Sequence, residues 1–520
     1  MFKNPLMGLD YPDVDVIRVE DTYYMVSTTM YFMPGCVILR SYDLVNWEIA
    51  GYVYETLEET PGHRLAGEQN IYGQGMWAAS LRYHKGTFYI CFVANDTHKT
   101  YLFQSESVEG PWRKQNIEGF YHDAALFFDE DDRVYIIAGN SAIWLTELRS
   151  DLTGPKEGGI RRIIVEDKDH PSLGYEGTHF YKINGRYYAF FIHSLRTEWF
   201  RTEACFSSDS LLGEFTGGDI LQDDMGFRHS GVAQGGIVDT PDGKWYALLF
   251  QDRGAVGRIP VLVPLYWEGH APVLGINGRV PLQLEVTSTR PDYRYEPLSA
   301  SDDFDYKPSE DGKIHLKKVW QWNHNPHKEL WSVTERPKAL RLHSGKICEN
   351  LTQSYNTLTQ RTGEPESAAW VTVDGSGLKD GDYAGITALQ GCYGAVALTR
   401  DKGEYALVMV GKSSPETSMT EDYGHTLPEK EYERIPVDSP MVTLKCRTDY
   451  REERDEAEFY YEKAGKWIPI GSSHKLTFKL DHFTGCRFGL FYYSTKETGG
   501  ISDFLKFHYE TVKAAEPVDA

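Results

Sequence analysis

The sequence predicts an all-β protein in which a five-bladed β-propeller is followed by a β-sandwich of jelly-roll type. One hairpin pattern occurs five times before about residue 275, at intervals of 65, 46, 53 and 58 residues. Helix patterns are absent from this half, and the second half has many short alternating strands between Gly, Asn and Asp turns. Repeats of about 50 residues have room for four strands each, which is typical of propeller blades.

The repeated pattern is a turn dipeptide, one spacer, and a bulky residue followed by Tyr. Each copy lies between two apolar runs, which is the sequence signal of a β-hairpin. Five copies therefore predict five blades. The copies are Glu20-Asp21-Thr22-Tyr23-Tyr24, Lys85-Gly86-Thr87-Phe88-Tyr89, Asp131-Asp132-Arg133-Val134-Tyr135, Asn184-Gly185-Arg186-Tyr187-Tyr188 and Asp242-Gly243-Lys244-Trp245-Tyr246.

One position upstream of each hairpin carries a different functional side chain. Counting back 10 residues from the bulky residue of the first copy, and 11 in each other copy, gives Asp13, Trp77, Asp123, Glu176 and Gln234. The innermost strand of each propeller blade lines a central channel. We therefore expect these five side chains to face one another at the channel mouth.

Three of these side chains are carboxylic acids: Asp13, Asp123 and Glu176. Three uncompensated carboxylates in a small cavity repel one another and resist desolvation, so at least one is expected to keep its proton at neutral pH. A protonated acid beside an ionised base is what glycoside hydrolysis requires. The alternative is that the acids cap turns or bond to backbone amides at strand ends. It explains any single acid better than three at one register.

The repeat ends near residue 275, and a polar, Pro-containing stretch follows. We predict a propeller catalytic domain over residues 1–285, a linker over 286–300, a β-sandwich accessory domain over 301–512 and a frayed tail over 513–520. Alternating segments such as 368–373 and 405–410 predict the sandwich.

The composition favours a neutral ligand. The chain has 54 Lys and Arg against 76 Asp and Glu, a formal net charge of −22. Such a surface repels nucleic acids and anionic membranes, so we expect neither as a partner. It suits a small oligosaccharide, and the 34 Tyr, 24 Phe and 12 Trp offer planes on which sugar rings pack. For most of these aromatic residues, filling β-sheet cores is the better interpretation.

Cysteine usage and the N-terminal residues predict a cytoplasmic protein. Seven scattered cysteines lack the spacing of a zinc or redox motif, which indicates reduced, buried thiols. Residues 1–5 show no signal-peptide pattern, and no apolar stretch is long enough to span a bilayer. A saccharide substrate inside the cell would be a short oligomer. The sequence leaves a homo-oligomer open.

Three segments around the acids carry a family resemblance. They read Tyr11-Pro12-Asp13-Val14-Asp15, His122-Asp123-Ala124-Ala125-Leu126 and Tyr175-Glu176-Gly177-Thr178-His179. Together with segments 32–35, 75–80, 257–261, 320–326 and 494–500, they resemble glycoside hydrolase family 43 over nearly the whole chain. Each motif alone is weak, but jointly they are specific.

The resemblance implies a five-bladed propeller with an accessory sandwich that hydrolyses terminal xylose or arabinofuranose with inversion. By residue, it implies that Asp13 is the general base, Glu176 the general acid, and Asp123 the group that orients and tunes the acid. An inverting mechanism predicts base and acid carboxyls about 6.5–9.5 Å apart, which leaves room for a water molecule.

The resemblance also suggests residues that bind the substrate. Phe32 and Trp77 are candidates for a sugar-stacking wall, with ordinary core aromatics as the alternative. Arg258 resembles the family arginine that contacts sugar hydroxyls and can pair with a carboxylate; a structural or surface arginine is the alternative.

One position departs from the family pattern. Many members carry a His on the inner strand of the fifth blade that can hold a hydrated Ca²⁺ in the channel, whereas this chain has Gln234 there. A Gln carbonyl can bind Ca²⁺, and His229 lies five residues earlier. A channel Ca²⁺ therefore remains an open expectation without assigned metal ligands, and the chemistry itself requires no cofactor.

The leading hypothesis is an exo-acting β-xylosidase that acts on xylo-oligosaccharides. The first alternative is primarily an α-L-arabinofuranosidase on arabinosylated oligomers, and the second a non-catalytic sugar-binding propeller with a lectin-like sandwich. The sandwich domain is either a carbohydrate-binding module or a lid that narrows the channel into a pocket.

Overall fold

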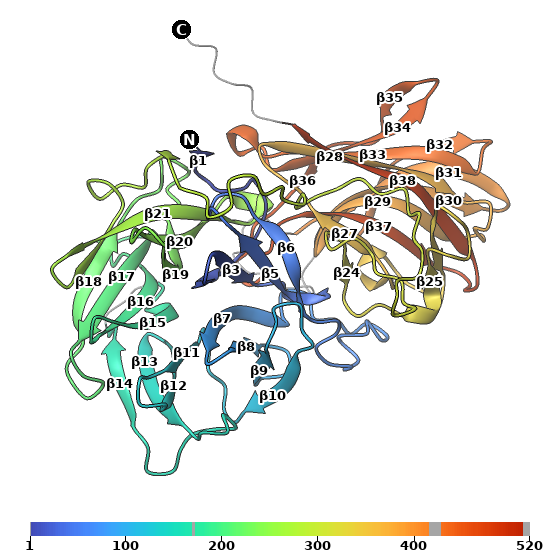
Figure 1. The fold of residues 1–520 in the computed structure, drawn as a ribbon. Helices are drawn as coiled ribbons and strands as arrows, with labels where there is room; N and C mark the ends of the chain where they lie inside the picture. The colour runs from blue at the N-terminus through green and yellow to red at the C-terminus, as the bar shows by residue number, and fades with distance from the viewer. Residues whose placement is uncertain (1, 169–171, 415–427, 513–520) are drawn as a thin grey trace, which may run out of the picture.

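The computed structural model describes residues 2–168, 172–414 and 428–512. It contains two all-β units side by side, one built of five four-stranded sheets and one of two large stacked sheets (Figure 1). The predicted five-bladed propeller followed by a β-sandwich is therefore confirmed. In the described ranges, no helix is long and apolar enough to cross a membrane.

Each propeller blade is one sheet made of consecutive strands. Neighbouring first strands contact one another in a closed ring, so the first strand of every blade is the innermost. The first blade consists of β2 (Asp15–Val19), β3 (Thr22–Ser27), β5 (Gly35–Ser41) and β6 (Glu48–Tyr54), and the second of β7 (Met76–His84), β8 (Thr87–Ala94), β9 (Lys99–Ser105) and β10 (Arg113–Ile117). The third consists of β11 (Ala125–Phe128), β12 (Val134–Asn140), β13 (Ala142–Leu148) and β14 (Arg161–Glu166), and the fourth of β15 (Glu176–Ile183), β16 (Arg186–Ser194), β17 (Arg201–Ser208) and β18 (Thr216–Leu221). The fifth consists of β19 (Ala233–Asp239), β20 (Trp245–Asp252), β21 (Arg258–Glu268) and β22 (Ala271–Leu274).

The N-terminal segment closes the ring by lying along the fifth blade. Strand β1 (Phe2–Lys3) pairs with β23 (Gln283–Leu284). The Asn4 side chain donates to the Leu262 carbonyl at 2.8 Å and accepts from its N–H at 3.0 Å. The Tyr11 N–H donates to the Arg258 carbonyl at 3.0 Å. These bonds tie the first and last blades together without an exchanged strand.

The second unit is a sandwich of two sheets. The hydrogen-bonded order of the first sheet is β32 (Lys430–Val437), β31 (Glu404–Lys412), β30 (Cys392–Asp401), β29 (Asp382–Gln390), β37 (Arg487–Ser494), β27 (Leu358–Arg361), β24 (Gln321–Asn323) and β4 (Phe32–Met33). The second contains β25 (Trp331–Ser332), β26 (Leu340–His343), β38 (Ile501–Val512), β28 (Glu366–Asp374), β33 (Met441–Asp449), β34 (Glu456–Lys463) and β35 (Lys466–Pro469), with β36 (His474–Lys475) also paired to β34. In the described ranges the only helices are 3-10 helices: η1 (Gly254–Val256), η2 (Lys328–Leu330), η3 (Leu351–Gln353) and η4 (Arg451–Glu453).

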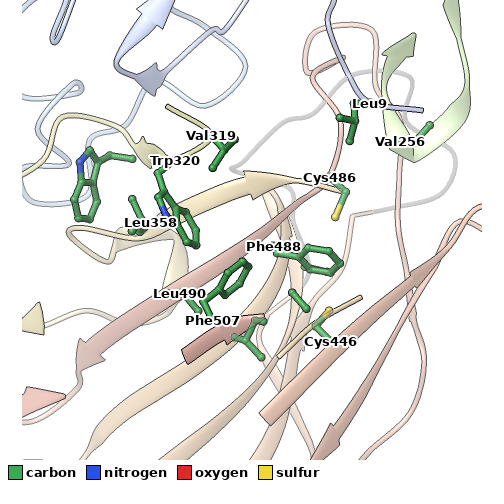
Figure 2. Close-up of a cluster of buried hydrophobic side chains, with 14 of the residues drawn as sticks. Leu9, Val256, Val319, Trp320, Leu358, Cys446, Cys486, Phe488, Leu490 and Phe507 are labelled. Atoms are coloured by element: carbon green, nitrogen blue, oxygen red, sulfur yellow. The ribbon is translucent and has the colours of Figure 1, made fainter. Parts of the chain in front are cut away.

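The two units share strands and core. Strand β4 comes from the first propeller blade, yet it pairs with β24 and forms the edge of the first sandwich sheet. Leu9 and Val256 of the propeller belong to the same hydrophobic cluster as Cys486 and Phe488 of the sandwich (Figure 2). Separating the units would expose this apolar surface to water, so burial holds them together.

The connection between β36 and β37 of the sandwich contacts the propeller. The N–H of Cys486, at the end of this connection, donates to the Ala255 carbonyl at 2.9 Å. The Tyr31 hydroxyl and His482 Nε2 lie 2.8 Å apart in a hydrogen bond. These contacts fix residues 476–486 against the first and fifth blades.

The segment between the two units is pinned to the first blade. Thr289 donates its N–H to the Tyr42 carbonyl at 2.7 Å, and Arg290 Nε donates to Asp21 at 2.7 Å. The predicted limits at residues 285, 300 and 512 stay predictions, and the predicted tail 513–520 lies outside the described residues. All seven cysteines are buried.

We expect Leu9→Ala to lower the stability of both units together, because Leu9 lies in the shared cluster. Deleting a buried leucine side chain costs about 2–5 kcal/mol. Scanning calorimetry should show one unfolding transition shifted to lower temperature. The matched control is Leu212→Ala, whose leucine is 68% exposed and should leave the transition in place. Two separate transitions, only one of them lowered, would contradict a shared core.

Candidate active site

A one-residue bulge in every inner strand shapes the site. The pairing register shifts by one between Trp77 and Ser80 in the second blade, and the fourth and fifth blades show the same shift. In the first and third blades, the backbone hydrogen bonds to the Pro12 and His122 carbonyls are displaced by one residue from the pairing register of the strands that follow. The bulged residues all have positive φ: Asp13 (52°), Ala78 (33°), Asp123 (48°), Gly177 (65°) and Gln234 (55°). A bulge re-aims side chains at the end of a strand, which is where these residues lie.

The predicted single register is in fact two adjacent registers. Asp13, Asp123 and Gln234 are bulged residues, whereas Trp77 and Glu176 directly precede one. Two residues join the first two strands in the first, second and fourth blades, but five residues join them in the third and fifth. Each longer loop adds one residue to the distance between the bulky hairpin residue and the bulged residue. Counting a nearly constant distance back from the bulky residue therefore led to the bulged residue in some blades and to the residue before it in others.

Six of the seven predicted site residues line one pocket. They are Asp13, Trp77, Asp123, Glu176, Gln234 and Arg258. The pocket has a volume of about 140 Å³, and His122, Leu173, Trp199, Arg201, Leu480 and Phe483 complete its lining.

Asp13 is held between a guanidinium and a hydroxyl. Its Oδ1 accepts from Arg258 Nη1 at 2.5 Å and its Oδ2 from the Thr28 hydroxyl at 2.7 Å, and only 4% of the residue is exposed. Arg258 Nε also donates to Asp252 at 3.1 Å, and Asp252 pairs with Arg201 Nη1 at 2.7 Å. Because the charges alternate along this chain of contacts, each buried ion has an opposite neighbour that offsets its desolvation cost.

His122, Asp123 and Glu176 form a second group. Nε2 of His122 lies 3.7 Å from Asp123 Oδ2 and 3.6 Å from Glu176 Oε2. Asn140 Nδ2 donates to Glu176 Oε2 at 2.5 Å, and the Gly177 N–H donates to Asp123 Oδ2 at 3.2 Å. One side-chain atom from each of the three lies within 4.8 Å of the others, a group that does not include Asp13.

Burial and charge set the protonation of this group. Burial raises the pKa of Asp123 to about 6; the cation of His122 opposes this rise, and the charges of Glu176 and Asp13 add to it. The charge of Asp123, in turn, is the main reason that the pKa of His122 rises to about 9. At neutral pH the group therefore contains an imidazolium beside an ionised Asp123.

Aromatic residues from both units form the wall. Trp77 comes from β7, and its ring meets Phe483 of the sandwich edge-on, with centroids 4.9 Å apart. Phe483 also stacks on the Arg258 guanidinium at 3.5 Å. Trp199, in the connection between β16 and β17, is 39% exposed. The pocket is therefore an interface site that neither unit lines alone.

Phe32 does not contribute to this wall. It is 1% exposed, and the Arg487 guanidinium covers its ring at 3.6 Å. As part of β4 it joins the sandwich sheet, so its ring has no face open to a ligand. The aromatic ring that faces Trp77 in this wall is that of Phe483.

Gln234 packs against the backbone of the fourth blade. A Cβ atom added to Gly177 would lie 2.5 Å from Gln234 Cδ, and Gly177 also has positive φ. The Gln234 N–H donates to Glu203 Oε2 at 2.7 Å. Burial raises the pKa of Glu203 well above its ordinary value and so favours the neutral form of this carboxyl. Glycine is thus required beside the acid so that Gln234 can approach.

The channel residues do not fit the Ca²⁺ that the family resemblance raised. Between the inner strands, Arg82 pairs with Asp15 at 2.6 Å, and His179 Nε2 lies 3.6 Å from the same carboxylate. Calcium takes six to eight oxygen ligands, whereas here the carboxylate of Asp15 is already paired with the Arg82 guanidinium. The side chain of His229, which lies five residues before Gln234, is 57% exposed and pairs with Glu198 at 2.8 Å.

Sequence reasoning missed half of the pocket. His122 directly precedes Asp123, but only the bulge explains why both line the pocket. Arg201 lies on β17, the third strand of the fourth blade, and Phe483 lies more than 400 residues from Trp77 in the sequence. No spacing rule therefore points to either residue. Residues missed in this way are His122, Leu173, Trp199, Arg201, Leu480 and Phe483.

Two family models match this chain. The model for glycosyl hydrolases family 43 matches residues 2–272. The model for the beta xylosidase C-terminal concanavalin A-like domain matches residues 302–510.

Named proteins are similar over most of the chain. A beta-xylosidase of Formosa agariphila is 28% identical, and the match covers 98% of this chain and 91% of that protein. A non-reducing end alpha-L-arabinofuranosidase of Bacteroides ovatus is 26% identical, over 80% of this chain and 77% of that protein. The solved structure of a bifunctional GH43-CE protein of Bacteroides eggerthii has a TM-score of 0.89 and 41% identity over 98% of this chain. This chain spans only 64% of the length of that bifunctional protein.

We expect Gly177→Ala to impair the site more than it impairs folding. A side chain at positive φ costs roughly 1–2 kcal/mol, and the new methyl group would also push Gln234 aside. Gly185→Ala is the matched control, because Gly185 also has positive φ but has no neighbour within 4 Å of the added Cβ. Chemical denaturation should show similar losses of stability, while only Gly177→Ala lowers hydrolysis of an aryl glycoside by tenfold or more. Equal effects on hydrolysis would contradict the packing role.

Proposed function

This chain belongs to glycosyl hydrolase family 43, and from that premise we propose that it releases terminal xylose from short xylo-oligosaccharides with inversion. It is a glycosidase, and a carbohydrate is its substrate. The choice of xylose, the exo mode, the inversion and the role of each residue are the proposal.

The size of the pocket and its wall from the second unit carry the proposal. Ligand sites for drug-sized molecules have volumes of about 300–1,000 Å³, whereas this pocket has about 140 Å³. Leu480 and Phe483 of the sandwich form part of its wall. A small pocket with a wall from a second unit accepts one sugar ring at a chain end more readily than a chain that passes through. The sandwich thus acts as a lid in this proposal.

Asp13 is the general base. Arg258 and Thr28 donate to its two oxygens, and hydrogen bonds to the charged form of a carboxylate favour that form. An ionised Asp13 can accept a proton from a water molecule as that water attacks the anomeric carbon. The attack comes from the face opposite the leaving oxygen, so the configuration at that carbon inverts.

Glu176 is the general acid. It donates its proton to the glycosidic oxygen as the bond to the anomeric carbon breaks, and Asn140 holds its Oε2 at 2.5 Å. The charge of Asp123 lies close to Glu176, and two negative charges in one small site disfavour each other. After the reaction Asp13 carries the proton and Glu176 is ionised, and exchange with solvent restores both. Asp123 thereby tunes and orients the acid.

The remaining lining residues bind the sugar. Trp77 and Phe483 offer apolar surface to the C–H bonds of the ring. Nε of Arg201 is buried and has no hydrogen-bond partner among the described residues, so a sugar hydroxyl would satisfy it. Trp199, at 39% exposure, can contact the next residue of the oligosaccharide.

The second candidate is an enzyme that acts primarily as an α-L-arabinofuranosidase. One relative with 26% identity bears that activity in its name, close to the 28% of the named beta-xylosidase. The acids would have the same roles with either pentose. Cytoplasmic location and a homo-oligomer stay predictions.

Two aryl substrates and two oligosaccharides test this proposal. We expect a higher kcat/KM on aryl β-xyloside than on aryl α-L-arabinofuranoside, and xylotetraose should release xylose before any xylobiose. Glu176→Gln should lose about 10²–10⁴-fold in kcat on xylobiose, the usual contribution of a general acid. The matched control is Glu214→Gln, an exposed residue of the same blade. Full activity of Glu176→Gln, or xylobiose as the first product, would contradict the proposal.

A further inference from the structure

His122 lies where a positive charge has the greatest effect on the acid. Its Nε2 is 3.7 Å from Asp123 and 3.6 Å from Glu176, distances of an ion pair rather than of a hydrogen bond. Its side chain is 26% exposed, whereas that of Asp123 is 7% exposed. The other nearby cations are engaged elsewhere, because Arg258 pairs with Asp13 and Arg201 with Asp252.

The bulge of the third blade places His122 there. Successive side chains of a regular strand point to opposite faces. The extra residue at Asp123, with φ of 48°, breaks this alternation, and both His122 and Asp123 line the pocket. In the other blades the residue before the bulge is Pro12, Trp77, Glu176 or Ala233. The third blade alone contributes an ionisable residue at both positions.

One carboxylate oxygen of Asp123 and one of Glu176 lie within 4.8 Å of each other. Two carboxyls in one site disfavour a second negative charge, so in the proposed mechanism they share one proton. Burial alone would put that proton on the wrong group, because Asp123 is more buried than Glu176, whose side chain is 20% exposed. Glycoside cleavage requires the proton on Glu176. Something must therefore favour the ionised form of Asp123.

We propose that His122 is a positioning residue whose imidazolium keeps Asp123 ionised and thereby leaves the shared proton on Glu176. The Gly177 N–H, which donates to Asp123 Oδ2 at 3.2 Å, acts in the same direction. This inference rests on the proposed role of Glu176 as the acid.

The side chain of His122 is charged at neutral pH. The pKa of His122 is raised to about 9, chiefly by Asp123, so the imidazolium is present below that pH and lost above it. The other charged groups that act on it are Glu176 and Asp13. Without the imidazolium, burial and the two neighbouring carboxylates would lead Asp123 to take up the proton.

His122→Asn tests the inference through pH and leaving group. We expect kcat on xylobiose at pH 7 to fall about tenfold or more, a part of the roughly 10²–10⁴-fold that a general acid contributes. An aryl xyloside with an activated leaving group, which needs little protonation, should lose much less. The basic limb of the kcat/KM profile should also move to higher pH, because removing a cation makes the carboxyl pair hold its proton more tightly.

The matched control is His84→Asn. His84 has nearly the same side-chain exposure, 27%, and a similar ion pair with Asp132 at 3.6 Å, but it lies outside the pocket. It should leave both the rates and the profile unchanged. In a double-mutant cycle, His122→Asn should cost little when Asp123→Asn is already present, because the histidine acts through that carboxylate.

The outcomes separate this inference from the proposed function. If Glu176→Gln keeps full activity, the proposed function itself fails. If Glu176→Gln is inactive while His122→Asn has the wild-type pH profile and an equal effect on both substrates, only the inference is overturned. Should His122→Asn not fold, a comparison of His122→Lys with His122→Gln decides. Only the lysine variant keeps a positive charge, so only that variant should keep the basic limb of the wild-type kcat/KM profile.

Discussion

The bulge repeated in all five inner strands is the constraint on which the site depends. A propeller offers a near-symmetric ring of strand ends, and regular strands would present one side chain per blade to the channel mouth. The bulges, with left-handed residues from Asp13 to Gln234, break this alternation, and in the third blade two consecutive side chains, His122 and Asp123, line the pocket. Symmetry therefore supplies the positions, and the side chains at two registers supply a chemistry that differs from blade to blade.

The second constraint is electrostatic. The pocket contains several buried ions, and burying an unpaired ion is expensive. Asp13, Arg258, Asp252 and Arg201 alternate in sign and offset one another, whereas Asp123 and Glu176 have only His122 between them. This asymmetry fits a fixed, ionised base on one side and a group that shares a mobile proton on the other. Phe483, which covers the Arg258 guanidinium, makes that arrangement depend on the sandwich unit.

The sequence allowed the fold class and the ring of functional residues to be predicted, because both follow from local periodicity. Tight turns next to Tyr23 and Tyr187 mark hairpins, and a near-constant offset leads from them to Asp13 and Glu176. The same offset could not reveal that Glu176 precedes a bulge while Asp13 is the bulge, since a longer loop compensates for the difference.

Contacts between distant segments were beyond such reasoning. Phe32 matched a family motif, but its backbone joins a sandwich sheet through pairing with Asn323, which buries its ring. The ring that faces Trp77 is that of Phe483 from the other unit, where nothing in the local sequence marks it. His122 was visible beside Asp123, yet a regular strand would have turned it away from the pocket.

The configuration of the first-formed sugar tests the central claim most directly. If Asp13 activates water opposite an acid at Glu176, no covalent intermediate forms and the configuration inverts. Proton NMR of a β-xyloside digest, recorded before mutarotation, should then show α-xylose appearing first. If β-xylose appeared first, the configuration would be retained, and Asp13 could not be the base of a single displacement.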